Sequence, residues 1–250
     1  MVELFAAPDI TLAASLSLVL VSAVTSFLTA AAGIGGGIVL LSVMAVLVPA
    51  TVIIPIHGAV QIGSNLGRTA LMLPYVERPI LLPFLFGTVL GATLGGMTAV
   101  QLPPGILKIG LALFILWSVW GRSIGASGQL ATIGTGMASS FLTMFFGATG
   151  TFVSAMVKTL KLGRMEHVAT HSACMVAQHA VKVVVFGLLG FSFAPYLGLI
   201  IGMVASGFIG TLLGKRFLLK TSDNRFHQIL SLLLSVLAIR LIYEGWTLLW

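Results

Sequence analysis

The sequence predicts an all-α integral membrane protein, and its composition and the spacing of its charges carry this prediction. The chain is 58% hydrophobic and 8% charged, whereas soluble domains carry about 25% charged residues. Charge-free stretches cover 10–67, 79–107, 123–157 and 183–214, and each exceeds the roughly 20 residues that cross a bilayer as a helix. Strand-like alternation is absent, so we expect about 8–10 membrane segments, all helical.

The termini, the cysteine content and the charge exclude several classes of protein. MVELFAAPDI, at the N-terminus, carries Glu3 and Asp9 without a basic region, unlike a cleavable signal peptide. Cys174 is the single cysteine, which excludes an intrachain disulfide and a cysteine-cluster metal site; no metal or other cofactor is expected. The net charge of +7 lies mostly in 158–164 and 215–225, typical of cytoplasmic loops, and does not indicate nucleic-acid binding.

The chain contains a low-identity internal repeat. SFLT occurs at 26–29 and again at 140–143, an offset of 114 residues, and glycines, histidines and basic residues recur in step. We interpret 1–123 and 124–250 as two transmembrane repeats of one membrane domain. The matched pairs are Gly33 and Gly147, Gly36 and Gly150, His57 and His171, Asn65 and His179, and Arg68 and Lys182.

Each repeat is expected to contain five elements, in the same order. These are a first helix (11–32; 126–146), a short apolar segment (37–49; 151–160), a long helix carrying the histidine (53–74; 166–189), a glycine-spaced helix (79–100; 194–215) and a final helix (104–121; 225–249). The short segments either cross the membrane or re-enter it. Five segments per repeat give inverted halves and four give parallel halves; the loop charges favour inversion. The glycine spacing of the fourth element is typical of tight helix packing.

The two long helices each carry a polar stripe. His57, Gln61, Ser64, Asn65 and Arg68 share one face of the first, because their spacings follow the helical period. His171, Gln178, His179 and Lys182 occupy the matching face of the second, with Met175 in the place of Gln61. Two polar stripes on otherwise apolar helices cannot both face lipid, so we expect them to face each other or a water-filled cavity. Ionisable residues inside a membrane span are candidates for function. The alternative is that these residues have only structural roles. Arg68 and Lys182 would then extend their charged ends to the membrane interface, and the histidines would pack in the interior with a hydrogen bond to a carbonyl.

The glycine-rich segments predict interruptions of the helices. Within AAGIGGG, at 31–37, a new helix should begin near Gly36, and within GATGT, at 147–151, near Thr149. The donors exposed there would be Gly35, Gly36, Gly37 and Gly150, with hydroxyl groups and N-capping from Thr149 and Thr151. A helix N-terminus attracts anions, and transporters place such breaks at the membrane midplane. The alternative is a glycine-rich helix contact; a dinucleotide fingerprint is excluded because no strand precedes it.

Both features indicate a pocket for a small anion, since donors and cations converge without an acidic residue nearby. The residues expected to bind the anion are Gly35, Gly36, Gly37, His57, Gln61, Asn65, Arg68, Thr149, Gly150, Thr151, His171, Gln178, His179 and Lys182. Oxyanions fit best because several donors can bind their oxygens at once. His57 and His171 are candidates for proton coupling, because imidazole titrates near neutral pH. Arg240 and Glu244, four residues apart on the last helix, should form a structural ion pair.

These residues resemble the TauE/SafE sulfite exporter family of bacterial membrane transporters. The resemblance covers essentially the whole chain and is most specific over 26–68, which includes the GIGGG break. It implies a multi-pass protein of the bacterial inner membrane that moves sulfite, thiosulfate or organosulfonates. The substrate and its direction do not follow from it.

We therefore expect a secondary transporter that works by alternating access, with a small anion and the lipid bilayer as its partners. The oligomeric state, monomer or homodimer, is open. A passive anion channel and a carrier of a non-sulfur carboxylate are the alternatives. An intramembrane enzyme is disfavoured because no acid/base pair with Asp or Glu accompanies the histidines. A scaffold is disfavoured because buried cations without a ligand are costly.

Overall fold

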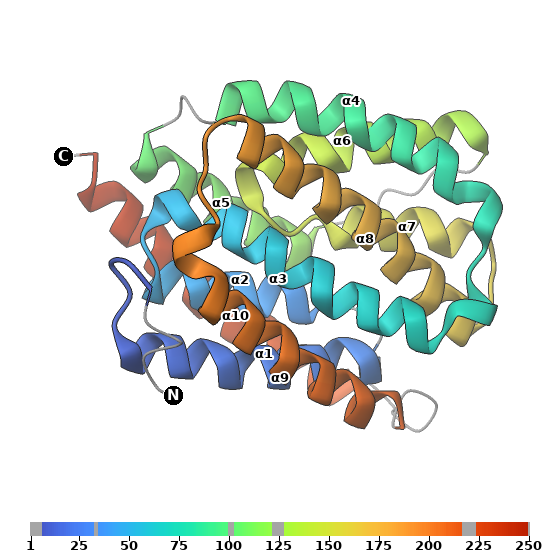
Figure 1. Cartoon of the computed structure of the whole chain (residues 1–250), viewed down its shortest axis with the longest axis horizontal. Helices are drawn as coiled ribbons and strands as arrows, with labels where there is room; N and C mark the ends of the chain where they lie inside the picture. Colours follow the sequence, from blue (N-terminus) through green and yellow to red (C-terminus); the bar gives the residue numbers. More distant parts are fainter. Residues whose placement is uncertain (1–6, 33–34, 100–102, 122–127, 217–223, 250) are drawn as a thin grey trace.

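The computed structural model describes residues 7–32, 35–99, 103–121, 128–216 and 224–249 (Figure 1). Glu3, Gly33, Arg122, the repeat boundary at 123–124 and most of the loop 215–225 lie outside these residues. Helices dominate the described residues, and β structure there is limited to one isolated bridge between Ala7 and Ile10. The all-α prediction is confirmed.

Ten α-helices occupy the described residues, and their bounds lie close to those expected from the sequence. The first five are α1 (Leu12–Ala32), α2 (Gly36–Leu47), α3 (Ala50–Leu71), α4 (Leu81–Ala99) and α5 (Pro104–Trp120). The other five are α6 (Gln129–Phe146), α7 (Gly150–Thr159), α8 (Arg164–Leu188), α9 (Leu197–Lys215) and α10 (Asn224–Thr247). Short 3₁₀ turns, η2 (Leu73–Tyr75), η3 (Arg78–Ile80) and η4 (Ala194–Tyr196), lead into α4 and α9.

Four described segments are long and apolar enough to cross a membrane. They are Leu12–Ala31, Arg78–Thr98, Arg164–Leu188 and Ala194–Lys215, and two shorter apolar helices are Gly36–Leu47 and Gly105–Trp117. Large apolar side chains also face outward; Leu82 is 76% exposed and Leu188 is 82% exposed. A soluble surface seldom carries so many. The chain is a multi-pass membrane protein, and the number of eight to ten segments stays a prediction.

Two helix pairs are joined by direct backbone contact. α4 packs parallel to α6, and α1 packs parallel to α9; the pairs lie along opposite edges of the molecule, with α3 and α8 between them (Figure 1). A Cβ added to Gly87 or Gly91 would overlap a carbonyl oxygen of α6, and one added to Gly210 would overlap that of Ala23 in α1. Small residues permit this approach where lipid supplies no hydrophobic driving force between helices. The predicted close packing of both glycine-spaced helices is confirmed.

The two long helices cross at the centre of the molecule in antiparallel orientation. Near one end of the contact, Gly58 of α3 lies against Lys182 of α8. At the other end, Arg68 of α3 donates a hydrogen bond to Ser172 of α8 at 3.3 Å. The two polar stripes therefore face each other, as their sequence spacing predicted.

The glycine contact between α4 and α6 gives a first test. Gly91→Ala places a methyl group against the Met137 carbonyl, and overpacking of this kind costs about 1–3 kcal/mol. Gly134→Ala, on the exposed face of α6, has no atom within 4 Å of its added Cβ and serves as the control. We expect the melting temperature in detergent to fall by several degrees for Gly91→Ala and to stay unchanged for Gly134→Ala. Equal melting temperatures for the two variants would contradict the backbone contact.

Candidate functional site

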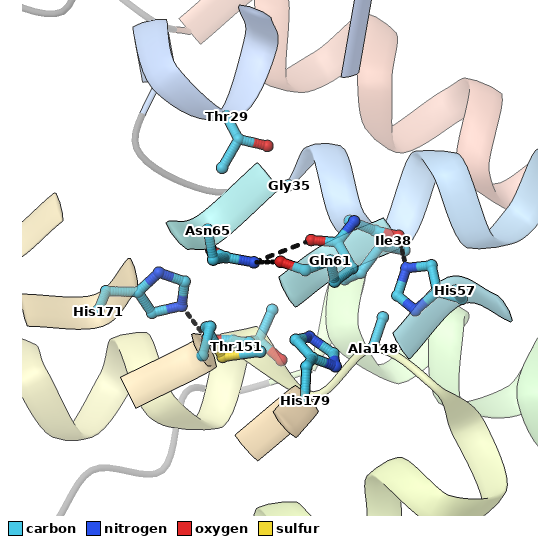
Figure 2. A pocket seen from close by; sticks show the side chains of 13 residues that line it. Thr29, Gly35, Ile38, His57, Gln61, Asn65, Ala148, Thr151, His171 and His179 are labelled. Carbon is cyan, nitrogen blue, oxygen red and sulfur yellow. Dashed lines mark hydrogen bonds between the residues drawn. The ribbon is translucent and has the colours of Figure 1, made fainter. Parts of the chain in front are cut away.

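A cavity of about 40 Å³ lies where the N-termini of α2 and α7 meet α3 and α8 (Figure 2). One water molecule needs roughly 10–15 Å³ of such space, so the cavity has room for a few water-sized groups. Residues on or next to five helices line it: α1, α2, α3, α7 and α8. Four of these helices were expected to contribute to the site. α1, which contributes Thr29, was not. The lining residues are Thr29, Gly35, Gly37, Ile38, His57, Gln61, Asn65, Ala148, Gly150, Thr151, His171, Met175 and His179.

Both glycine-rich segments interrupt helices, as predicted. α2 begins at Gly36, directly after Gly35, whose φ is 107°. α7 begins at Gly150, three residues after Gly147, whose φ is 76°. Both φ values lie in the left-handed region that glycine adopts most readily. The chain turns at these two glycines and starts a new helix at the cavity.

The start of each short helix contributes main-chain donors to the cavity wall. N–H groups in the first turn of a helix have no acceptor within that helix. Gly37 of α2 and Gly150 and Thr151 of α7 belong to such turns and line the cavity. Each N-terminus also carries about half a positive charge from the aligned peptide dipoles. The hydroxyl of Thr151 is buried and has no hydrogen-bond partner among the described residues.

His57 and His171 occupy equivalent places against the two breaks. The Nε2 of His57 lies 3.0 Å from the Gly37 carbonyl, and that of His171 lies 3.0 Å from the Gly150 carbonyl. Because a carbonyl oxygen only accepts, Nε2–H is the donor in both bonds. The Nδ1 atoms of both rings are buried and unpartnered within the part of the chain that the structure describes.

A third histidine completes the group. The His179 ring lies edge-on to that of His57, with centroids 5.8 Å apart and an interplanar angle of 79°. Its Nδ1 likewise has no partner among the residues described. The three imidazoles line one cavity, although they come from helices that run in opposite directions (Figure 2).

Arg68 lies one layer behind the cavity wall. Its Nη1 donates to the side-chain oxygen of Asn65 at 3.0 Å, and Asn65 in turn donates from Nδ2 to the Gln61 main-chain and side-chain oxygens at 2.8 and 3.1 Å. Further bonds reach Ser172 at 3.3 Å and Ser64 at 3.4 Å. Arg68 is 1% exposed, so its side chain ends inside the protein and not at its surface.

Lys182 is also buried, but its ammonium group is bound to a helix end. Its Nζ donates to the Gly147 carbonyl at 3.0 Å and to the Thr143 hydroxyl at 3.5 Å. Neither Lys182 nor Arg68 has a carboxylate within ion-pair distance among the described residues. Two cations are therefore held in the interior without a described counter-ion.

Nine of the fourteen residues predicted for the site line the cavity. The other five, Gly36, Arg68, Thr149, Gln178 and Lys182, lie behind the lining. Gly36 packs against Thr25 and Thr29 of α1. Thr149 was expected to cap α7 with its hydroxyl, and this prediction is wrong. Its Oγ1 instead donates to the Ser139 carbonyl at 3.0 Å and accepts from Gln178 Nε2 at 2.9 Å, because it is buried between α6 and α8.

Some residues of the site region were not predicted from the sequence. Thr29 lies in the repeated SFLT segment, which signalled the repeat but not the cavity. His167, one turn before His171, pairs through Nε2 with the Ser154 hydroxyl at 3.0 Å. Arg164 donates from Nη2 to the Ala31 carbonyl in the last turn of α1 at 3.2 Å. Their partners are distant in sequence, so spacing gave no signal.

The predicted ion pair on the last helix is confirmed, with one addition. Arg240 Nε lies 2.8 Å from Glu244 Oε1. Lys108 of α5 was not predicted, and its Nζ lies 2.7 Å from Glu244 Oε2. The Lys108–Glu244 pair joins α5 to α10, and neither residue lines the cavity. Among the described residues, no group of three or more His, Cys, Asp or Glu side chains could hold a metal ion.

The fold and the cavity define a polytopic α-helical membrane protein whose cavity, at two broken helices, includes histidine and amide side chains in its lining. The chain belongs to the sulfite exporter TauE/SafE family, whose model matches residues 18–241. This is a family of anion transporters, as the sequence resemblance implied. No curated protein and no solved structure matches the chain significantly.

The two threonines at the second break provide a matched test. Thr149→Val removes a hydroxyl with two buried hydrogen bonds, so we expect a loss of about 1–3 kcal/mol of stability. Thr151→Val removes a buried hydroxyl without a described partner, so its stability should be unchanged or slightly higher. Thermal unfolding in detergent measures both. A loss at Thr151 as large as that at Thr149 would refute this assignment of roles.

Proposed function

We propose that the protein is a secondary transporter of a small sulfur oxyanion or organosulfonate, of the sulfite, thiosulfate and sulfoacetate class. It would work by alternating access in the bacterial inner membrane, with substrate bound between the two halves at the cavity. Family membership supports the transport of an anion. The substrate class, the coupling and the site are inferred from the chemistry of the cavity.

One observation carries the proposal: positive charge converges on the cavity without a described carboxylate to neutralise it. Arg68 and Lys182 are 1% and 0% exposed, and an unpaired buried charge is costly. Two helix N-termini add to the same positive potential. A bound anion would supply the missing negative charge.

The shape of the donor set supports an oxyanion. First-turn N–H groups at Gly37, Gly150 and Thr151 come from two helices, and the unpartnered Thr151 hydroxyl lies among them. Asn65 and Gln61 add side-chain amides from α3. Several oxygens can be bound at once by donors that approach from different sides, and charge assistance strengthens each bond.

The histidine geometry supports proton coupling. With Nε2–H donating to a carbonyl, a neutral ring presents the Nδ1 lone pair, which repels an anion. Protonation converts Nδ1 into a cationic donor. Binding of the anion and protonation of His57 and His171 therefore favour each other, and imidazole changes charge near neutral pH.

The arrangement of helices supports two inverted repeats. If α1–α5 and α6–α10 are compared in order, the α1–α9 pair corresponds to the α6–α4 pair. The corresponding helices α3 and α8 run antiparallel, and so do α5 and α10, in which Trp120 bonds Ser235 at 2.9 Å and Gly105 meets Gly245. Such symmetry exchanges the two membrane faces, which suits alternating access.

Transport by the purified protein in proteoliposomes tests the proposal. Uptake of sulfite, thiosulfate, sulfoacetate and acetate should be measured with and without a pH gradient. We expect saturable uptake of sulfur anions that depends on the gradient. Preference for acetate would indicate a carboxylate carrier, and large unitary currents would indicate a channel; either would refute the proposal.

The histidines give the residue-level prediction. His57→Ala and His171→Ala should each reduce uptake at least about tenfold, since each removes a proton-binding group from the cavity. His167→Ala, which lies outside the cavity lining, is the matched control and should retain most uptake. Size-exclusion profiles report folding. Wild-type flux in both cavity variants would refute this site.

A further inference from the structure

We infer that α8 positions both halves of the anion site by neutralising the carbonyl ends of the two interrupted helices. Lys182 does so for α6 and Arg164 does so for α1. Neither is inferred to touch the anion; both are positioning residues. The inference rests on the proposed anion site and assigns to these two cations a role that differs from that of a ligand.

The physical problem arises at any break in a helix. The helix that ends there carries about half a negative charge on its last carbonyls, and the helix that begins carries about half a positive charge on its first N–H groups. When both ends lie within a few residues, their fields nearly cancel. A break attracts an anion strongly only if the carbonyl end is neutralised.

At the second break, Lys182 supplies this neutralisation. α6 ends at Phe146 and α7 begins at Gly150. The Gly147 carbonyl between them accepts bonds from Lys182 Nζ at 3.0 Å and from the Thr143 hydroxyl at 2.9 Å. The next residue, Ala148, already lines the cavity. The ammonium group thus lies on the carbonyl side of the break, and the N–H side faces the cavity.

At the first break, Arg164 has the corresponding place. Its Nη2 donates to the carbonyl of Ala31, in the last turn of α1, at 3.2 Å. α2 begins a few residues later at Gly36, and Gly35 and Gly37 line the cavity. One helix, α8, therefore reaches the carbonyl ends of both broken helices, from two positions five turns apart.

Gly58 of α3 fixes the path of the lysine. A Cβ at this position would lie 2.7 Å from Lys182 Cε, so the absence of a side chain allows the lysine to pass. Cε lies near the end of a flexible side chain, so Gly58→Ala should be accommodated by displacement of the ammonium group. This variant keeps the charge and moves it away from the Gly147 carbonyl.

Initial rates of sulfite uptake into proteoliposomes, measured over a range of sulfite concentrations, test the inference. We expect Lys182→Met and Arg164→Met to raise KM about tenfold, with a smaller change in kcat, because they weaken the attraction for the anion. Lys182→Arg keeps the positive charge, so its KM should lie within about threefold of the wild-type value. Gly58→Ala should raise KM several-fold. Lys215→Met is the control: it removes a 2.9 Å bond to the Leu71 carbonyl at the end of α3, away from the cavity, and should leave KM unchanged.

The outcomes separate the two proposals. Wild-type uptake with an unchanged KM in Lys182→Met and Arg164→Met overturns the inference and leaves the proposed function standing. Absence of uptake by the wild-type protein for every anion refutes the proposed function, and the inference with it. If Lys182→Met does not fold, Gly58→Ala and Arg164→Met decide, and a wild-type KM in both overturns the inference.

Discussion

Helix ends buried inside the protein are the constraint on which this structure depends. Main-chain groups that lack partners are costly where water is scarce, yet α1 and α6 both stop in the interior and α2 and α7 both start there. The protein satisfies the carbonyl ends with side chains: Arg164 binds Ala31, and Lys182 and Thr143 bind Gly147. His57 and His171 bind carbonyls in the first turns of the short helices. Gly37, Gly150 and Thr151, in the first turns of the short helices, line the cavity, where we propose that their N–H groups bind the anion.

This division of the main-chain groups explains why the polar residues are concentrated on α3 and α8. Those two helices cross antiparallel between the breaks, so side chains from both can reach either one. Arg68 and Lys182 match in the repeat but act differently: Arg68 organises Asn65 and Ser172, whereas Lys182 binds a helix end. The two predicted repeats therefore differ in these contacts.

Much of the fold could be predicted from the sequence because lipid restricts the options to helices, and glycines mark where they stop. The starts of α2 and α7 and the facing polar stripes followed from local spacing. Thr149 shows the limit: a threonine before a helix suggests a cap, but its hydroxyl is taken by Ser139 and Gln178. Likewise, the bonds of Arg164 to Ala31 and of Lys108 to Glu244 join segments more than a hundred residues apart, and no local pattern encodes them. The repeat boundary and the membrane orientation of the halves stay predictions.

The glycine faces of α4 and α9 have a consequence for how the protein can change over evolution. Their contacts with α6 and α1 run through main-chain atoms, so the geometry of these pairs is independent of the side chains on the outer surface. Leucines on the lipid side can therefore be exchanged for other apolar residues, to suit bilayers of different thickness or lipid content, without moving the helices that frame the cavity. Substitutions among the outer apolar side chains therefore leave the distances between these packed helices unchanged.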